Sequence, residues 1–328
     1  MKTNFSKNNI ALISIYYGNQ PKYLSLFLSS AKLNSNFDFH IFSEWEELPI
    51  KASNIKLHKL SFLEFNKLAL DKKIITKNIQ NPYKLCDLKP AWPLILDHYF
   101  KLNRYDYIGY TDIDLILGDI ESFVTKDLIQ KPDIWSLHSE YMSGSFLLLK
   151  NNFQNKTLFK YKDYYKLIFD SQNHYAFDEK FLPKYKNISF KGNPIYSFTD
   201  IVNHLEKKGV ISTVRKHDIL FESRPEKLVF KNGHLFDNNS KELFGFHFLL
   251  AKRYILWTYP SWIELPKQFY INKYGFYIKR PISFISLFTR TNNYNQIFSK
   301  LSNINFKYIL KNNSFSTLLK SLNKQLFD

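Results

Sequence analysis

The fold is decided by residues 104–120, which read RYDYIGYTDIDLILGDI. The apolar, aromatic run from Tyr105 to Tyr110 predicts a buried strand, and Asp112 and Asp114 follow directly after it. In an extended turn, side chains two residues apart project to the same side, so both carboxylates can meet one divalent cation. We therefore expect a cation site where this strand ends. A solvated loop at the end of a strand is the alternative interpretation.

The residues before this stretch alternate between strand-like and helix-like segments. Strands are expected at Ile10–Tyr17, Phe37–Phe42 and Ile55–Leu60, and helices at Pro21–Leu33 and Pro90–Phe100. Such alternation is typical of a parallel, doubly wound sheet. In these sheets ligands bind beyond the carboxyl ends of the strands, where Asp112 and Asp114 lie.

The later part of the chain has a second set of segments and then a change in composition. Further strands are expected at Asp133–His138 and Phe146–Leu149, and helices at Phe153–Phe169 and Ile201–Lys208. Phe244–Leu250 is an apolar run that carries His247. Beyond Pro266 the sequence is rich in Lys, Asn, Phe, Ile and Leu, which we interpret as helical segments. We therefore expect a catalytic domain over residues 1–264 and a basic, mainly helical C-terminal extension over residues 265–328.

The composition excludes several classes of protein. The chain has 328 residues with 31 Phe, 22 Tyr and 5 Trp, an aromatic content too high for an intrinsically disordered protein. Its single cysteine, Cys86, excludes an intrachain disulfide framework and fits a reducing compartment, where we expect it to pack as a small residue. The uncharged apolar runs are shorter than the roughly 18 residues of a membrane-spanning helix. Met1–Gly18 lacks a small-x-small cleavage site. A cytoplasmic location is expected.

The net charge of +17 is unevenly distributed along the chain. Residues 265–328 hold ten Lys and Arg against one acid, whereas residues 84–122 hold seven acids against four bases. An acidic segment in a basic protein favours a cation site. The basic, aromatic tail suits an anionic membrane surface, where each basic residue contributes about 1 kcal/mol. Nucleic acid is a competing partner, but the sequence has no helix-turn-helix, zinc-finger, KH or RRM signature, so no nucleic acid is expected. A solvated helix face is the third interpretation.

Three segments resemble those of a known family. Residues 104–120 resemble the Asp-x-Asp segment of GT-A glycosyltransferases, particularly family 8. Met142–Asn151 is similar to the Asn-Ser-Gly strand of these enzymes, and Phe246–Arg253 is similar to their late His-Phe-x-x-x-x-Lys element. Tyr83–Trp92 also resembles the corresponding segment of bacterial polysaccharide glycosyltransferase-like proteins. The resemblance extends in order from roughly Ile10 to Trp257.

This resemblance implies a fold and a metal site. The fold would be a GT-A-like (Rossmann-type) mixed sheet flanked by helices. Asp112, Asp114 and His247 would hold Mn²⁺ or Mg²⁺, with His247 as the third ligand. A neutral imidazole beside two carboxylates makes a mixed nitrogen and oxygen site, which suits Mn²⁺ better than Mg²⁺. The alternative for His247 is a histidine whose hydrogen bonds are satisfied within an aromatic core.

The same resemblance implies the residues that bind the donor. Lys252 or Arg253 would pair with the β-phosphate, where a guanidinium could bind two oxygens. The small residues Ser143 and Gly144 would leave room for the sugar. Met142 stands where family 8 has the Asn of Asn-Ser-Gly, so fold and metal use transfer better than stereochemistry or the choice of sugar.

Asp178 and Glu179 are candidates for the acceptor side of the reaction. Either carboxylate could orient the acceptor hydroxyl or serve as its general base. This pair stands where family 8 has Asp-Gln, and Leu250 replaces the Gly of the late element. An exposed acidic pair on a loop is the alternative interpretation.

Four further residues are candidates for contacts with the nucleotide. Asp87 and Lys89 precede the helix expected at Pro90–Phe100 and could contact the base, ribose or phosphate. Asp87 could instead cap that helix. Tyr16 and Tyr17 end the first strand, where a base could stack on them, although a chain this aromatic favours buried aromatics of the core.

Together these features predict a metal-dependent glycosyltransferase of hexosyltransferase type. The donor would be a nucleotide sugar, with UDP as the expected nucleotide. The acceptor would be a bacterial surface glycan such as lipooligosaccharide or capsular polysaccharide, and a lipid-linked acceptor would explain a tail that associates with the inner face of the cell membrane. One alternative is another metal-dependent enzyme that cleaves phosphodiesters or diphosphates. The other is a non-catalytic basic protein that binds membranes or nucleic acid.

Overall fold

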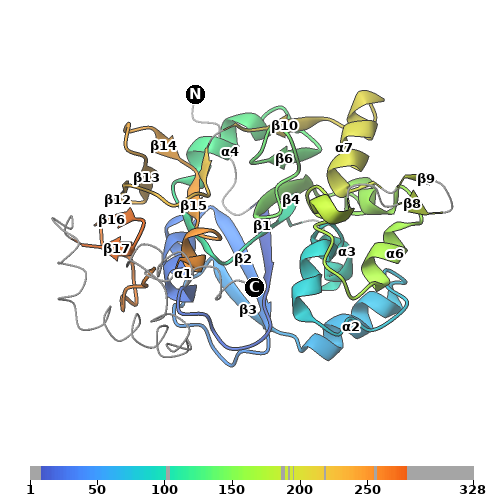
Figure 1. Cartoon of the computed structure of the whole chain (residues 1–328), viewed down its shortest axis with the longest axis horizontal. Helices are drawn as coiled ribbons and strands as arrows, with labels where there is room; N and C mark the ends of the chain where they lie inside the picture. Colours follow the sequence, from blue (N-terminus) through green and yellow to red (C-terminus); the bar gives the residue numbers. More distant parts are fainter. Residues whose placement is uncertain are drawn as a thin grey trace, which may run out of the picture. The chain divides into compact units, whose positions relative to one another are not determined.

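The computed structural model describes residues 9–100, 104–185, 189–190, 193–194, 196–217, 219–254 and 257–278. The chain forms two compact units, each built from several stretches of sequence (Figure 1). The first unit comprises residues 1–21, 31–113 and 120–219, and the second comprises residues 22–30, 114–119 and 220–328. The helix α1 (Leu24–Leu33) begins in the second unit and ends in the first.

The first unit is built on a seven-stranded sheet with the order β10-β6-β7-β4-β1-β2-β3. The strands are β1 (Ile10–Ile15), β2 (Phe37–Ser43), β3 (Ile55–Lys59), β4 (Tyr107–Thr111), β6 (Ile134–Ser136), β7 (Phe146–Lys150) and β10 (Thr213–Arg215). β1 runs parallel to β2 and β4, whereas β7 is antiparallel to β4 and β6. The predicted mixed sheet flanked by helices is confirmed, and the predicted strands of the first unit lie at or within one to two residues of their expected positions.

Short helices and 3₁₀ turns connect these strands. They are α2 (Phe62–Asp71), η1 (Pro82–Ala91), α3 (Trp92–Ile95), η2 (Asp97–Tyr99), α4 (Ile120–Leu128), α5 (Phe153–Lys156), η3 (Leu158–Lys160), α6 (Tyr165–Asp170), η4 (Pro183–Tyr185) and α7 (Phe198–Lys207), with a hairpin of β8 (Ser189–Phe190) and β9 (Asn193–Pro194). Ser61 and Ser197 begin α2 and α7 with capping boxes, in which each serine accepts the backbone N–H of the third helical residue.

Two predicted helices differ from those observed. The helix expected at Pro90–Phe100 begins earlier, because the Asn81 side chain accepts the Tyr83 N–H, and it continues as a 3₁₀ helix that contains Pro90. Proline lacks the N–H that an α-helix needs at such a position. The helix expected at Phe153–Phe169 is broken after four residues, where the Thr157 hydroxyl donates to the Phe153 carbonyl at 2.8 Å. Such a bond competes with continued helix formation.

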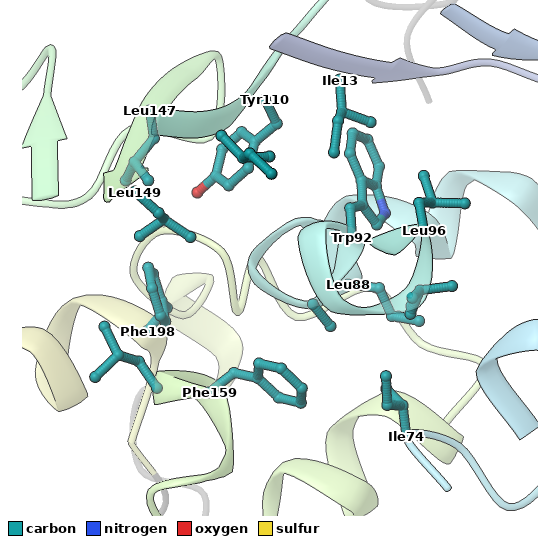
Figure 2. Close-up of a cluster of buried hydrophobic side chains, with 14 of the residues drawn as sticks. Ile13, Ile74, Leu88, Trp92, Leu96, Tyr110, Leu147, Leu149, Phe159 and Phe198 are labelled. Atoms are coloured by element: carbon teal, nitrogen blue, oxygen red, sulfur yellow. The ribbon is translucent and has the colours of Figure 1, made fainter. Parts of the chain in front are cut away.

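The core of the first unit fixes the position of β4. Figure 2 shows Trp92 and Tyr110 close to each other between the sheet and the helices, and their ring centroids are 6.2 Å apart. Ile13 of β1 and Leu147 of β7 belong to the same buried cluster. Because Tyr110 is held in this cluster, the end of β4 at Thr111 is fixed, and so is the point where Asp112 follows.

The second unit contains two small sheets. A three-stranded sheet has the order β11-β15-β5, from β11 (Leu220–Phe221), β15 (Gly245–His247) and β5 (Leu115–Leu117). An antiparallel sheet has the order β14-β13-β12-β16-β17, from β14 (Glu242–Leu243), β13 (His234–Phe236), β12 (Leu228–Lys231), β16 (Gln268–Asn272) and β17 (Gly275–Tyr277). The 3₁₀ helix η5 (Ala251–Arg253) follows β15.

The start of the predicted helical extension is wrong. Residues 268–277 form the hairpin β16–β17, and β16 pairs with β12, so the structure continues across the expected domain boundary at residue 264. The sequence carries a strand signal here, because the apolar residues Phe269 and Ile271 are spaced two apart and Gly275 can form a tight turn. In the structure both apolar side chains are buried, and Gly275 has a φ of 130°. The basic residues from Lys279 onward lie outside the described residues. In the described part of the chain, no helix combines the length and apolarity needed to cross a membrane.

His40 of β2 and His58 of β3 form a pair whose protonation we expect to destabilise the fold at low pH. Their rings stack, with 2.8 Å between His40 Nδ1 and His58 Nε2, and Lys56 adds a positive charge nearby. Burial first, and then these neighbouring positive groups, lower the pKa of His40 to about 2 and that of His58 to about 4. Both imidazoles are therefore neutral in the folded protein at pH 7.

Acidification below pH 6.5 is expected to lower the free energy of unfolding. The unfolded chain takes up a proton at each histidine near pH 6.5, whereas the folded chain does so only near pH 4 for His58 and pH 2 for His40. Urea denaturation at pH 7 and pH 4.5 measures this loss, and His58→Gln, which cannot take up a proton, should show a smaller one. An equal loss in both proteins would contradict the prediction.

Candidate functional site

The two aspartates of the Asp-x-Asp motif belong to different units. Asp112 follows β4 and belongs to the first unit, and Asp114 is the first residue of the stretch 114–119 in the second. The backbone N–H of Asp112 donates to the Ser145 carbonyl at 2.9 Å, and that of Phe248 donates to the Asp114 carbonyl at 3.1 Å. Each aspartate is therefore held by a backbone hydrogen bond within its own unit.

The cluster in the first unit is centred on Lys89, which lies in η1 and is buried. Its ammonium donates to the Gly144 carbonyl at 2.7 Å and forms ion pairs with Asp112 Oδ1 at 2.7 Å and Asp178 Oδ2 at 3.7 Å. Lys89 thus joins three predicted site segments: the Asp-x-Asp, the Ser-Gly-Ser turn before β7 and the Asp178-Glu179 pair. The structure brings together residues that the sequence places far apart.

Burial and charge set the protonation of this cluster. Burial alone would lower the pKa of Lys89, but the negative charges of Asp112 and Asp178 outweigh it and hold that pKa well above its ordinary value. Burial raises the pKa of Asp178 well above its ordinary value, and the nearby carboxylates of Glu179, Asp87 and Asp112 raise it further, against the opposing charge of Lys89. Asp178 is therefore a carboxyl group that can hold a proton more readily than a surface aspartate.

Gly144 has no room for a side chain. A Cβ atom there would lie 2.5 Å from Asp178 Oδ2 and 2.7 Å from Glu179 Oε1, and the Gly144 N–H donates to Glu179 Oε1 at 2.8 Å. The neighbouring Ser143 is buried and its hydroxyl lies 3.0 Å from that of Ser145. The absence of a side chain at Gly144 therefore lets both acidic groups approach the turn.

The cluster in the second unit is centred on Asp114. Its Oδ1 lies 3.3 Å from His247 Nε2, and its Oδ2 pairs with the Lys252 ammonium at 2.5 Å. The other ring nitrogen of His247, Nδ1, lies 2.9 Å from Glu222 Oε1. An ionised carboxylate only accepts hydrogen bonds, so Glu222 holds a hydrogen on Nδ1 while Nε2 donates to Asp114. A cation that displaced the Nε2 hydrogen would find the lone pair of Nε2 directed to the Asp114 side.

The chemistry of these groups fits a divalent cation. Burial acts to raise the pKa of Asp114, but the hydrogen bond from His247 and the charge of Lys252 outweigh it and hold that pKa well below its ordinary value. The carboxylate is therefore ionised at neutral pH, as a metal ligand must be. A carboxylate oxygen beside an imidazole whose second nitrogen bonds a carboxylate is a common metal-ligand arrangement.

Three other predicted donor-binding residues have no contact described above with either aspartate of the Asp-x-Asp motif. Tyr16 and Tyr17 follow β1, where the Tyr16 ring contacts Trp45 at a centroid distance of 5.5 Å and the Tyr17 ring contacts Phe62 at 5.1 Å. Arg253 is exposed at the end of η5. Their predicted contacts with the donor remain predictions.

Asp87 and Cys86 are placed inside the first unit. Asp87 lies within η1 rather than before a helix, so its predicted role as an N-cap is wrong. Its side chain is fully buried and pairs with Lys84, which leaves little access for a nucleotide. Burial raises the pKa of Cys86 to about 12, which agrees with its expected role as a packed, unreactive residue.

Residues 12–277 match the family of unknown function DUF6625. The chain belongs to this family. No curated protein matches the DUF6625 chain. Among solved structures, it is similar to galactosyltransferase LgtC in complex with donor and acceptor sugar analogues, with 12% identity and a TM-score of 0.35 over 65% of this chain and 75% of LgtC.

Two further structures are similar to the DUF6625 chain at the same level. An active-site mutant of LgtC has 13% identity and a TM-score of 0.35, over 65% of this chain and 75% of that one. The glycosyltransferase GlyE of Streptococcus pneumoniae TIGR4 has 11% identity and a TM-score of 0.32, over 65% of this chain and 46% of GlyE. The DUF6625 chain therefore spans less than half the length of GlyE.

Glu222 is a residue of the Asp114 cluster that the sequence motifs missed. It directly follows β11, which pairs in parallel with β15, and the register places Phe221 opposite Phe246. The next position along each strand brings Glu222 to His247. Only this pairing of short strands identifies Glu222, since 25 residues separate the two in the sequence.

Proposed function

We propose that the protein is a metal-dependent glycosyltransferase that moves a hexose from a nucleotide sugar, with UDP as the nucleotide, to a glycan acceptor. The observation that carries this proposal is the cluster of Asp114, His247 and Lys252 in the second unit. Asp114 and His247 would hold a cation, and the Lys252 ammonium on the same carboxylate would pair with the diphosphate that the cation binds. Asp112, two residues earlier in the chain, is the further ligand predicted from the sequence.

The proposed roles follow from the charge of each group. A bound Mn²⁺ would offset the negative charge of the departing diphosphate. Lys252 would leave Asp114 to pair with a phosphate oxygen, and its ammonium lies 5.6 Å from the centre of the Tyr23 ring, which limits its positions. Arg253, exposed on the same 3₁₀ turn, is the second candidate for the phosphate.

The cluster of the first unit would serve the sugar and the acceptor. In transfer, the bond between the sugar C1 and the phosphate oxygen breaks, the bond from C1 to the acceptor oxygen forms, and the acceptor hydroxyl loses its proton. Asp178 or Glu179 would orient that hydroxyl, and the raised pKa of Asp178 suits a group that receives a proton. Lys89 would hold Asp178 beside the Gly144 turn, in position for the acceptor hydroxyl.

The acceptor and the location belong to the same proposal. A bacterial surface glycan on a lipid carrier would explain the basic residues after residue 265, since a positive tail attracts an anionic leaflet. We propose that the protein acts in the cytoplasm at the inner face of the cell membrane. Vesicles containing anionic lipid should bind the full chain and release it at high salt.

Calorimetric titration with UDP tests the proposal. We expect UDP to bind with Mn²⁺ and about 100-fold more weakly without it, since a divalent cation contributes several kcal/mol to binding a diphosphate. Asp112→Asn/Asp114→Asn should lose the Mn²⁺-dependent part because the amide cannot neutralise the cation. The matched control is Asp106→Asn, an exposed aspartate of the same acidic segment that bonds Asn9.

Each outcome distinguishes the candidate functions. Mn²⁺-dependent UDP binding lost only in the double variant supports the nucleotide site at the Asp-x-Asp. A panel of UDP-sugars would then identify the donor, and release of inorganic phosphate without sugar transfer would indicate a diphosphate-cleaving enzyme instead. Absence of binding to UDP, GDP, CDP and dTDP would refute the glycosyltransferase proposal.

A further inference from the structure

Asp87 accepts hydrogen bonds from the segment that leads to Asp178. Its Oδ1 accepts the Phe177 N–H at 2.7 Å, and its Oδ2 accepts the Tyr175 N–H at 3.0 Å. The Lys84 ammonium donates both to Asp87 Oδ2 and to the Asn173 carbonyl, each at 2.6 Å. Both charged side chains are fully buried. This ion pair of η1 therefore holds the backbone of residues 173–177 at three points.

The held segment contains a strained residue. Ala176 has a φ of 60°, in the left-handed region that residues other than glycine rarely adopt. A residue there turns the N–H groups on either side of it toward one point, which makes a concave backbone site for an anion. In this protein the anion is the Asp87 carboxylate, and the bonds from Tyr175 and Phe177 offset the strain at Ala176.

The turn at Ala176 determines where the next two residues lie. The Glu179 N–H donates to the Ala176 carbonyl at 3.1 Å, so the acidic pair is built on this turn. Glu179 Oε1 then accepts the Gly144 N–H, and Asp178 Oδ2 pairs with Lys89. Lys89 also belongs to η1, so this 3₁₀ helix positions the acidic pair in two ways. Asp87 binds the backbone that precedes the pair, and Lys89 binds the side chain of Asp178.

We propose that the buried Lys84–Asp87 pair is a positioning device, which holds Ala176 in its left-handed conformation and thereby places Asp178 and Glu179 against the Gly144 turn. The inference rests on the proposed function only for the use of the acidic pair on the acceptor side. The geometric part concerns the chain by itself and is tested without any substrate.

Hydrogen–deuterium exchange resolved to single amides, in Asp87→Asn, tests this proposal. The Gly144 N–H is the reporter, because its hydrogen bond is to Glu179 and not to Asp87. We expect it to exchange about tenfold faster in the variant, since a bond to a charged group is lost and the local opening free energy falls. Adding Ala176→Gly should restore part of the protection, because glycine adopts a positive φ without strain.

The matched control is Asp38→Asn. Asp38 is also fully buried and paired with a lysine, Lys56, but it lies in β2. This control should leave Gly144 as protected as in the wild type, relative to core amides of β1. If Asp87→Asn does not fold, Lys84→Met/Asp87→Asn removes both charges together and should show the same change at Gly144.

Two results would overturn the proposal. One is faster exchange at Tyr175 and Phe177 with Gly144 unchanged, which would confine the effect of Asp87 to its own bonds. The other is a Gly144 change that Ala176→Gly does not reduce, which would mean that Asp87 does not act through the left-handed turn. Failure of the wild-type protein to bind UDP would refute the proposed function and leave the exchange result standing.

Discussion

Replacing Lys89 by methionine is expected to lower the free energy of unfolding by about 3–5 kcal/mol, the cost of leaving a buried charge unpaired. The variant keeps a flexible apolar chain of similar length but loses the ammonium. The Gly144 carbonyl would lose its donor, and the carboxylates of Asp112 and Asp178 would lose the positive charge between them. The pKa of Asp178 would then rise further, because the opposing charge of Lys89 would be lost while burial and the negative neighbours remain.

Chemical denaturation of Lys89→Met beside Lys72→Met measures this effect. Lys72 pairs with Asp97, but both side chains are partly exposed, so the control should lose no more than about 1 kcal/mol. Equal losses of unfolding free energy in the two variants would mean that the buried Lys89 cluster stabilises the fold no more than the partly exposed Lys72–Asp97 pair. If the proposed transfer activity is found, Lys89→Met should lose it, since the Asp112, Gly144 and Asp178 segments are no longer joined.

The strands of the first unit could be predicted because local sequence fixes them. β1, β2 and β4 are short apolar runs, and Gly18 with Pro21 marks the turn after β1. The position of Asp112 at the end of β4 follows from the same pattern. Prediction was less accurate where a distant partner decides the outcome, as in β16, whose apolar residues are buried by pairing with β12.

For the candidate site, the sequence predicts several of the residue types but not which side chains contact one another. The motifs point to Asp114, His247 and Lys252, and the structure brings these three together. No local pattern links Lys89 to Asp178 or His247 to Glu222, because 89 and 25 positions separate them and only tertiary structure unites them. A buried lysine in a basic chain carries no sequence signal that distinguishes it from a surface lysine.

Gly109→Ala is expected to be among the most destabilising substitutions in the first unit. Gly109 lies in β4 between β1 and β7, and a Cβ atom there would lie 1.9 Å from the Leu147 carbonyl oxygen. That oxygen belongs to the backbone of β7 and cannot move by a change of rotamer. This clash is relieved only if β4 and β7 separate. We therefore expect the free energy of unfolding to fall by about 3 kcal/mol or more, at or above the upper end of the range for an overpacked core.

Gly233→Ala is the matched control for this prediction. Gly233 lies in the turn between β12 and β13 with a φ of 90°, and a Cβ atom there would meet nothing within 4 Å. Gly233→Ala should lower the free energy of unfolding by only about 1 kcal/mol, because it strains the backbone without causing a clash. Because β7 continues from the Ser143-Gly144 turn, displacement of β7 in Gly109→Ala should also weaken the bond from Gly144 to Glu179. Urea midpoints that shift equally in the two variants would show that the close approach of β4 to β7 can relax.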